Sequence, residues 1–239
     1  MLRFIRSLLF SIVMIVLIIT FGGFCAFFRF LPQRVLHGST KIFGILITFA
    51  AKFICGIRYR VVGTEHIPTD RPYVVFCKHQ STWETFFMYT LLPRYSTILK
   101  EELLRIPVFG WGLSALQPIA INRNDKRSAM RQIIEQGKAC IEQGISILCF
   151  PEGTRTAPGA AADYKIGGAK LAEAVAAPIV PIALNSGECW PRRGFLKKSG
   201  TISVIIGPVI ETKDKQAKAI LIETRDWIEG EMQNINFTT

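Results

Sequence analysis

The chain has 239 residues, enough to bury one sizeable hydrophobic core with an appendage. Lysine and arginine outnumber aspartate and glutamate by 29 to 18, which gives a formal net charge of +11. Such an excess favours anionic partners such as phospholipid headgroups, phosphorylated substrates or an acidic carrier protein. We expect no nucleic-acid partner, because the sequence has no zinc-ligand spacing and no recognisable nucleic-acid-binding motif.

Hydrophobic residues make up 49% of the chain and are concentrated near the N-terminus. Residues 8–28 are apolar almost throughout, and as a helix they would extend about 30 Å, enough to span a hydrocarbon core. A second apolar stretch, residues 42–57, is interrupted by Lys52 and is short for a span. Basic residues flank the first stretch on both sides, so the charge distribution does not orient it in a membrane.

Two arrangements of this segment are open. Residues 8–28 span the bilayer, or they form a helical hairpin with residues 42–57 that enters one leaflet. We favour the hairpin, because it leaves both the N-terminus and the main domain in the cytosol. The six cysteines agree with a reducing compartment, since they have no paired spacing and several lie inside apolar runs typical of buried free thiols.

The pattern changes near residue 58. Strands are predicted over residues 59–63 (resembling an edge strand), 73–77, 95–99, 117–121, 145–150, 179–184 and 201–206. Helices are predicted over residues 82–92, 100–104, 128–143, 169–176 and 215–232. Alternating strands and helices predict an α/β fold with a largely parallel sheet flanked by helices. We therefore expect a membrane-associated helical segment over residues 1–57 and an α/β domain over residues 58–239.

Three polar clusters directly follow predicted strands: residues 78–84, 122–123 and 152–155. Ligands of such sheets bind beyond the carboxyl ends of the strands. The first cluster contains His79, one of only three histidines in the chain, and Glu84. Imidazole can accept a proton near neutral pH because its reference pKa is about 6.5, and a carboxylate would orient it. Glu84 is equally well explained by a capping box, in which Ser81 caps a helix and Glu84 bonds back to a free N–H.

The cluster after the strand at residues 145–150 places a carboxylate, a flexible glycine, a hydroxyl and a guanidinium in sequence. Gly153 allows the backbone to approach a ligand closely, and Arg155 can bind a phosphate with two hydrogen bonds. The alternative is a turn with a solvated pair between Glu152 and Arg155. Arg123 and Lys100 are each either further phosphate ligands or surface charges.

Taken together, these motifs resemble the four ordered sequence blocks of the glycerolipid acyltransferases, and most closely the 1-acyl-sn-glycerol-3-phosphate (lysophosphatidic acid) acyltransferase family of bacteria. The resemblance covers about residues 63–208, and its blocks are His79-x4-Glu84 and residues 121–123, 150–155 and 179–183. The first block departs from the family's usual His-x4-Asp, because Glu84 carries one more methylene. Thr156 stands where many members have serine.

The resemblance implies transfer of a fatty acyl group from acyl-CoA or acyl carrier protein to the free hydroxyl of lysophosphatidic acid. His79 would deprotonate that hydroxyl, and Glu84 would orient His79. The acceptor phosphate would be bound in a pocket formed by Lys100, Arg123, Glu152, Gly153, Thr154 and Arg155, with Pro181 on its far wall. No metal and no cofactor besides the acyl donor is expected.

Several alternatives remain open at this point. The acceptor could be another lysophospholipid or polar lipid, the enzyme could be a lipid hydrolase, or the chain could be a non-enzymatic membrane-bound scaffold. A hydrolase is disfavoured because residues 112–116 fail the G-x-S-x-G pattern at the last position. A P-loop phosphate enzyme is excluded because the sequence has no G-x-x-x-x-G-K-[ST] motif. The expected location is the bacterial inner membrane, with the catalytic domain facing the cytosol and contacting membrane phospholipids.

Overall fold

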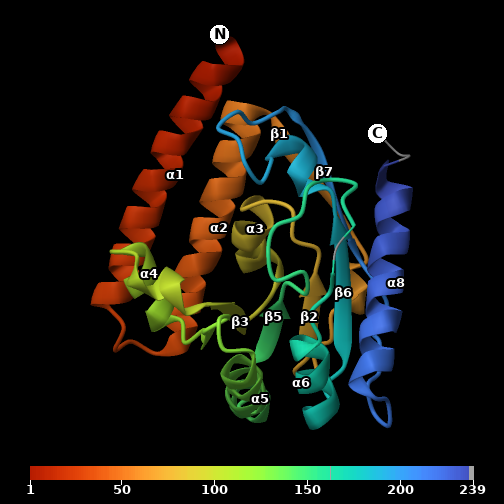
Figure 1. Cartoon of the computed structure of the whole chain (residues 1–239). Helices are drawn as coiled ribbons and strands as arrows, with labels where there is room; N and C mark the ends of the chain where they lie inside the picture. Colours follow the sequence, from red (N-terminus) through yellow and green to blue (C-terminus); the bar gives the residue numbers. More distant parts are fainter. Residues whose placement is uncertain (162, 237–239) are drawn as a thin grey trace.

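A computed structural model describes residues 1–161 and 163–236, and one seven-stranded sheet lies at its centre (Figure 1). The strand order is β1-β7-β6-β2-β5-β3-β4, and every neighbouring pair is parallel except β6 and β7. In chain order the strands are β1 (Ile57–Val62), β2 (Val74–Cys77), β3 (Tyr95–Lys100), β4 (Ile119–Ile121), β5 (Ser146–Cys149), β6 (Ile179–Leu184) and β7 (Gly200–Ile206). The predicted α/β fold with a largely parallel sheet is confirmed, and β1 is an edge strand as predicted.

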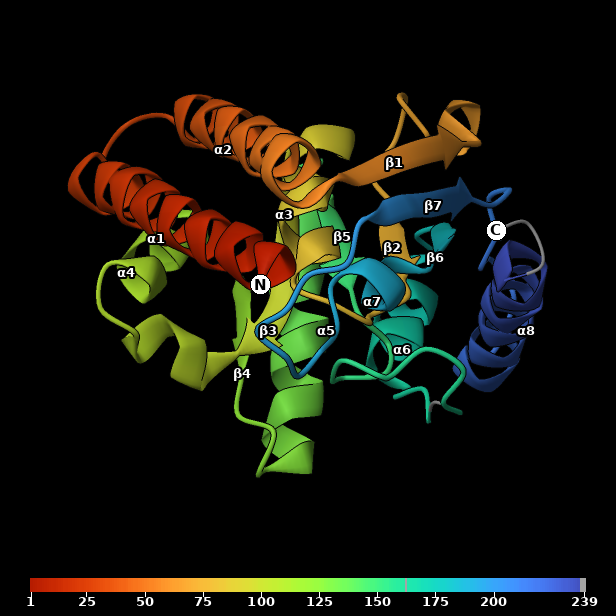
Figure 2. The same cartoon turned by 90° about the horizontal axis from the view of Figure 1, so that it is seen from above.

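Helices cover both faces of the sheet (Figure 2). Helices α1, α2 and α3 lie on one face, and α5, α6 and α8 lie on the other. The helices are α1 (Leu2–Phe27), α2 (Gln33–Cys55), α3 (Trp83–Leu91), α4 (Phe109–Ala115), α5 (Lys126–Glu142), α6 (Gly167–Val175), α7 (Ser186–Cys189) and α8 (Ala217–Asn236), with short 3₁₀ helices η1 (Thr64–His66) and η2 (Glu101–Arg105).

Strand β2 shows how the sequence builds this arrangement, because all of its residues are apolar and alternate between the two faces. Val75 and Cys77 pack into the core that contains residues of α2 and α3. Val74 and Phe76 pack into the other core, with residues of α5, α6 and α8. A continuous apolar strand is therefore buried on both faces, as its pattern predicted.

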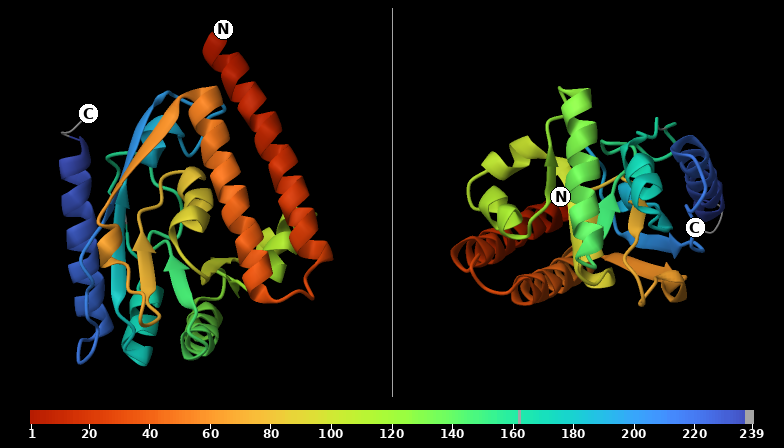
Figure 3. Two further views of the ribbon diagram at one scale, coloured as in Figure 1. Left: turned by 180° about the vertical axis from the view of Figure 1, so that it is seen from behind. Right: turned by 90° about the horizontal axis from the view of Figure 1, so that it is seen from below.

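The N-terminal helices α1 and α2 form an antiparallel pair beside the sheet (Figures 1 and 3). By length and composition both helices could cross a membrane. In the most apolar stretch of α1 only 11% of the residues are buried, whereas in that of α2 half of them, 50%, are buried. One face of α2 packs on the domain, where the rings of Phe43 and Phe86 meet edge to face at 5.3 Å. The other face exposes Ile42, Phe49 and Phe53. These exposed apolar helices indicate membrane association.

Several helices begin or end at residues other than those predicted from the sequence. Helix α5 begins at Lys126 rather than at residue 128, because the Asp125 carboxylate accepts hydrogen bonds from the N–H groups of Arg127 and Ser128 and caps the helix. The helix predicted over residues 100–104 is the 3₁₀ helix η2. Helices α4 and α7 were not predicted. The division at residue 57 stays a prediction, and its second part includes residue 162 and residues 237–239, which lie outside the described residues.

Candidate active site

The loops that follow β2 and β5 meet at the carboxyl edge of the sheet. The parallel pairing places Phe76 of β2 opposite Cys149 of β5, so both strands end at the same level. The loop after β5 then bonds to the main chain of His79. The carbonyl of His79 accepts hydrogen bonds from the Thr156 N–H at 2.8 Å and the Thr156 hydroxyl at 3.2 Å. Two of the predicted polar clusters therefore form one site.

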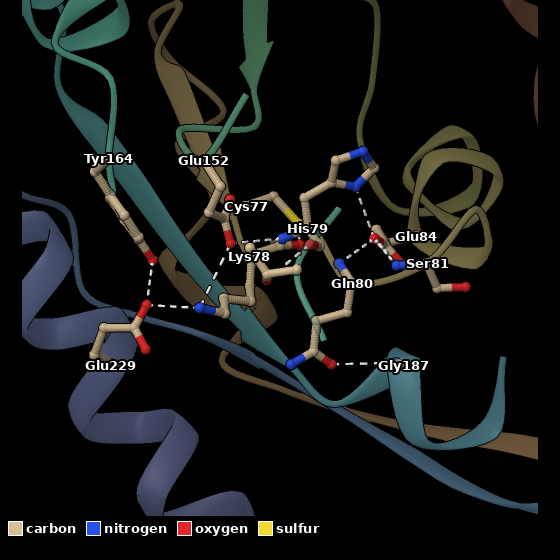
Figure 4. Close-up of polar contacts among 11 residues, drawn as sticks. Cys77, Lys78, His79, Gln80, Ser81, Glu84, Glu152, Tyr164, Gly187 and Glu229 are labelled. Atoms are coloured by element: carbon tan, nitrogen blue, oxygen red, sulfur yellow. Dashed lines mark hydrogen bonds and ion pairs between the residues drawn. The ribbon is translucent and has the colours of Figure 1, made fainter. Parts of the chain in front are cut away.

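Glu84 lies fully buried next to His79 (Figure 4). Its Oε1 atom is 2.8 Å from Nδ1 of His79 and also accepts hydrogen bonds from the N–H groups of Gln80 at 2.8 Å and Ser81 at 2.7 Å. Its Oε2 atom accepts a 2.6 Å hydrogen bond from the Ser186 hydroxyl. Glu84 therefore combines both interpretations, since one carboxylate accepts the backbone N–H groups directly before α3 and also contacts the imidazole.

The imidazole of His79 is held on two sides and open on a third. Its ring stacks on Phe150 with 4.1 Å between the centroids and 22° between the planes. The Glu84 contact leaves the other ring nitrogen, Nε2, without a partner among the described residues. The side chain is 17% exposed and lines a cavity of about 280 Å³. With Nδ1 donating to a carboxylate, Nε2 is the nitrogen that can accept a proton.

This cavity has a polar part and an apolar part. Residues of α1, α2, α3, β3 and α4 supply most of the apolar lining, including Ile18, Phe21, Phe43, Phe86, Phe109 and Leu113. The same lining includes His79 together with Lys100, Arg123, Gly153, Thr154 and Arg155. A molecule with an anionic end and a long apolar end fits such a lining.

The two arginines of the polar part are anchored by hydrogen bonds. Arg155 donates from Nη1 to the Thr82 hydroxyl at 2.7 Å, and Arg123 donates to the carbonyl of Gly153. Burial lowers the pKa of Arg123, but a guanidinium stays protonated at neutral pH. Each guanidinium keeps further N–H donors for an anion. The structure thus brings together five of the six residues predicted to form the phosphate pocket.

Glu152 and Pro181, the other two residues predicted to shape the pocket, are not among the residues that line this cavity. The Glu152 side chain is only 1% exposed, and its Oε1 accepts a 3.1 Å hydrogen bond from the His79 N–H (Figure 4). It therefore contacts the main chain of His79 from inside the domain. Pro181 lies inside the buried strand β6, opposite Phe76.

Sequence reasoning missed Ser186 and Arg192. Ser186 follows the end of β6 by two residues, so the rule that polar residues after strands form sites could have found it. Arg192 donates to the Thr154 hydroxyl at 3.1 Å, and only its place in a short basic run could have indicated this contact. Within residues 1–161 and 163–236 no group of three or more His, Cys, Asp or Glu side chains is placed to bind a metal ion.

Cys77 and Cys149 lie beside the site but are buried thiols. Burial raises the pKa of Cys149 to about 12 and raises that of Cys77 well above its usual value. Both stay protonated and unreactive near neutral pH. We therefore predict that N-ethylmaleimide leaves both cysteines unlabelled in the folded protein and labels them after denaturation, as peptide mass spectrometry would report. Labelling of either thiol in the folded protein, with loss of activity, would contradict this assignment.

Comparison with known proteins finds acyltransferases by both family model and sequence similarity. A family model described as Acyltransferase matches residues 58–185. The 1-acyl-sn-glycerol-3-phosphate acyltransferase of Pseudomonas aeruginosa is 42% identical over 197 residues, covering 82% of this chain and 73% of that protein. The human 1-acyl-sn-glycerol-3-phosphate acyltransferase alpha is 33% identical over 172 residues, which cover 70% of this chain and 60% of the relative's length, less than two thirds.

A crystal structure of the 1-acyl-sn-glycerophosphate (LPA) acyltransferase PlsC from Thermotoga maritima also matches. The match has a TM-score of 0.81 and covers 97% of this chain and 95% of that chain. Sequence identity between the two is 22%, so this likeness supports the fold.

Proposed function

Because this chain belongs to the acyltransferase family, we propose that it transfers a fatty acyl group to the free sn-2 hydroxyl of 1-acyl-sn-glycerol 3-phosphate. The product is phosphatidic acid, an intermediate of phospholipid biosynthesis, and the donor is acyl-CoA or acyl carrier protein. One observation carries this function. His79, paired with the buried Glu84, lines a cavity that combines the cationic side chains of Lys100, Arg123 and Arg155 with a largely apolar remainder.

The chemistry follows from this geometry. Nε2 of His79 accepts the proton of the sn-2 hydroxyl while its oxygen attacks the thioester carbonyl. Glu84 stabilises the imidazolium that forms and keeps the ring oriented through Nδ1. When the tetrahedral intermediate collapses, the carbon–sulfur bond breaks and the imidazolium returns its proton to the thiolate. Oxygen takes the place of sulfur on the acyl carbon, so the transfer needs no acyl-enzyme and no additional cofactor.

Arg123, Arg155 and Lys100 bind the phosphate of the acceptor in this proposal. Gly153 and Thr154 complete the polar lining. The apolar lining from α1, α2 and α4 receives acyl chains, so the membrane helices also form part of the substrate site. Holding the hydroxyl and the thioester in one cavity removes much of the entropic barrier to their reaction.

Replacing Arg155 with glutamine is expected to raise the apparent KM for lysophosphatidic acid about 10- to 100-fold, because hydrogen bonds between charged groups contribute about 1.5–3 kcal/mol. The matched control is Arg131→Gln, which removes the same charge from an exposed position on α5 and should leave that KM unchanged. Steady-state kinetics with each substrate varied in turn measures both. A change confined to the KM of the acyl donor would contradict the phosphate assignment.

A location at the membrane is also part of this proposal. Helix α2 is half buried against the domain while α1 is largely exposed, which favours a hairpin inserted into one leaflet over a span by residues 8–28. Such a hairpin places the cavity beside the lipids that it uses. In this proposal the membrane is the bacterial inner membrane and the catalytic domain faces the cytosol; the relative from Pseudomonas aeruginosa supports only the bacterial part of this assignment. The net charge of +11 favours contact with anionic phospholipids.

The function is tested by incubating the detergent-solubilised protein with a panel of lysolipids and with acyl-CoA or acyl carrier protein. Lysophosphatidic acid is expected to be the preferred acceptor, with release of free CoA or carrier protein in equal amount to the product. Preference for a lysolipid with a larger headgroup would overturn the acceptor assignment. Fatty acid released without any acceptor would indicate a hydrolase.

A further inference from the structure

A lysine lies buried directly before the catalytic histidine. The side chain of Lys78 is 3% exposed, although an ammonium group loses much of its hydration when it is buried. Such a charge is tolerated only where carboxylates or other acceptors surround it. Lys78 does not line the substrate cavity, so its charge is not there to bind the acceptor phosphate. The groups that surround Nζ of Lys78 must therefore account for the burial of its charge.

Two carboxylates from distant parts of the chain supply those partners (Figure 4). Nζ of Lys78 is 2.6 Å from Oε1 of Glu229, on the C-terminal helix α8, and 3.5 Å from Oε1 of Glu152. The Tyr164 hydroxyl donates a 2.9 Å hydrogen bond to the same Oε1 atom of Glu229, which fixes that carboxylate. The ammonium also lies 5.9 Å from the centre of the Tyr164 ring.

This cluster continues to the backbone of His79. Oε1 of Glu152 is the atom that accepts the His79 N–H at 3.1 Å. Oε2 of Glu152 is buried without a hydrogen-bond partner among the described residues, so this carboxylate is held through its other oxygen. The groups alternate in charge from Glu229 to Lys78 to Glu152, and the series ends on the N–H of the catalytic residue. Each charged side chain in this series therefore lies next to an opposite charge or an N–H donor.

We propose that Lys78 and Glu229 are positioning residues for the catalytic imidazole, and that helix α8 thereby fixes the position of the loop that carries His79. This inference rests on the proposed function of His79. Glu229 draws the ammonium between the two carboxylates, and the ammonium lies 3.5 Å from the Glu152 oxygen that accepts the His79 N–H. Burial raises the pKa of Glu152, and the nearby ammonium opposes that rise. Nδ1 of His79 meets Glu84 at 2.8 Å only if the backbone of His79 stays where Glu152 and Thr156 hold it.

The test compares two substitutions on the same helix. Glu229→Gln keeps the shape of the side chain and removes its charge, and Glu223→Gln makes the same change at an exposed ion pair with Lys215. We expect kcat to fall on the order of tenfold in Glu229→Gln, because small displacements of a catalytic group are costly. The KM for lysophosphatidic acid should not change, since the arginines of the cavity are untouched. Glu223→Gln should match the wild type in both constants.

Histidine NMR gives a second readout that does not depend on turnover. The chain has only three histidines, His37, His66 and His79, so ring-labelled protein gives a short spectrum that His79→Ala assigns. The His79 ring signals should shift in Glu229→Gln and stay in place in Glu223→Gln. If the wild type transfers no acyl group, the proposed function fails, whereas this shift still decides whether Glu229 positions the ring.

A purely structural role for Glu229 predicts a different result. In that case Glu229→Gln would lower the melting temperature while leaving kcat and the His79 signals as in Glu223→Gln, and our inference would be overturned. If Glu229→Gln does not fold, Tyr164→Phe decides the matter, because it removes one hydrogen bond to Glu229 and leaves every charge in place. A lower kcat with an unchanged KM would support the inference, and wild-type kinetics with wild-type His79 signals would overturn it.

Discussion

Replacing His79 with alanine is expected to lower kcat for acyl transfer to lysophosphatidic acid about 1000-fold, within the range typical of a lost general base. The acceptor hydroxyl then has no group to accept its proton, because the ring nitrogen facing the cavity is gone. The KM for lysophosphatidic acid should change little, since Arg155 and Arg123 are anchored independently of the imidazole. Steady-state release of CoA measures both constants.

A second histidine provides the control for this substitution. His66 lies remote from the cavity and its ring contacts the carbonyl of Ile206 at 2.9 Å. His66→Asn keeps a group that can donate to this carbonyl, so we expect wild-type turnover. A His79→Ala protein that retains a tenth or more of the wild-type kcat while folded would remove His79 from the chemistry.

The second large effect is expected at Glu84, where two roles can be separated. Glu84→Gln can keep all four contacts, because its amide oxygen can accept from His79, Gln80 and Ser81 while its NH₂ donates to the Ser186 hydroxyl. The charge that stabilises the imidazolium is lost. We therefore expect kcat to fall about 100-fold, with the melting temperature close to that of the wild type.

Glu84→Ala should instead affect both turnover and stability. It leaves two buried backbone N–H groups and a buried hydroxyl without their acceptor, and each such loss costs about 1–3 kcal/mol. The free energy of unfolding should therefore fall by about 3 kcal/mol or more in chemical denaturation. Glu84→Asp restores the charge with a shorter side chain and should lie between the glutamine variant and the wild type in kcat. Near-normal turnover in Glu84→Gln would leave Glu84 as a structural residue only.

The parts of the fold that follow from local pattern could be predicted from the sequence. Strand β2 is a continuous apolar run, and its burial on both faces follows from the alternation of its side chains. The cluster of polar residues after parallel strands also follows, because those strands end at one edge of the sheet. The strand order and the antiparallel pairing of β6 with β7 could not be predicted, since they depend on contacts between distant segments.

Helix α4 shows how tertiary contacts override local preference. Its sequence contains Gly110 and Gly112, which disfavour a helix by about 1 kcal/mol each relative to alanine. A side chain at Gly110 would meet the carbonyl oxygens of η2 at 2.4–2.5 Å, and one at Gly112 would lie 2.6 Å from the backbone of Gly22 in α1. The glycines are needed because α4 packs closely against both elements, a requirement that no short window of sequence reveals.

Glu152 illustrates the same limit within the site. The residues around it predict a turn, but they do not say which side chain of the turn points inward. The direction of the Glu152 side chain is decided by the buried ammonium of Lys78, in the loop after β2, and by Glu229 on the last helix. Ionic partners separated by 74 and 151 positions leave no local pattern. The catalytic pair could be predicted because His79 and Glu84 are only five positions apart.

The central claim is that His79 and its carboxylate partner drive acyl transfer to the sn-2 hydroxyl of lysophosphatidic acid. The most direct test supplies an isotopically labelled acyl donor and unlabelled lysophosphatidic acid, and locates the label in the lipid products by mass spectrometry. The account predicts label at the sn-2 position of phosphatidic acid with the wild type and almost none with His79→Ala. Label found chiefly in free fatty acid, or equal labelling of phosphatidic acid by both proteins, would contradict it.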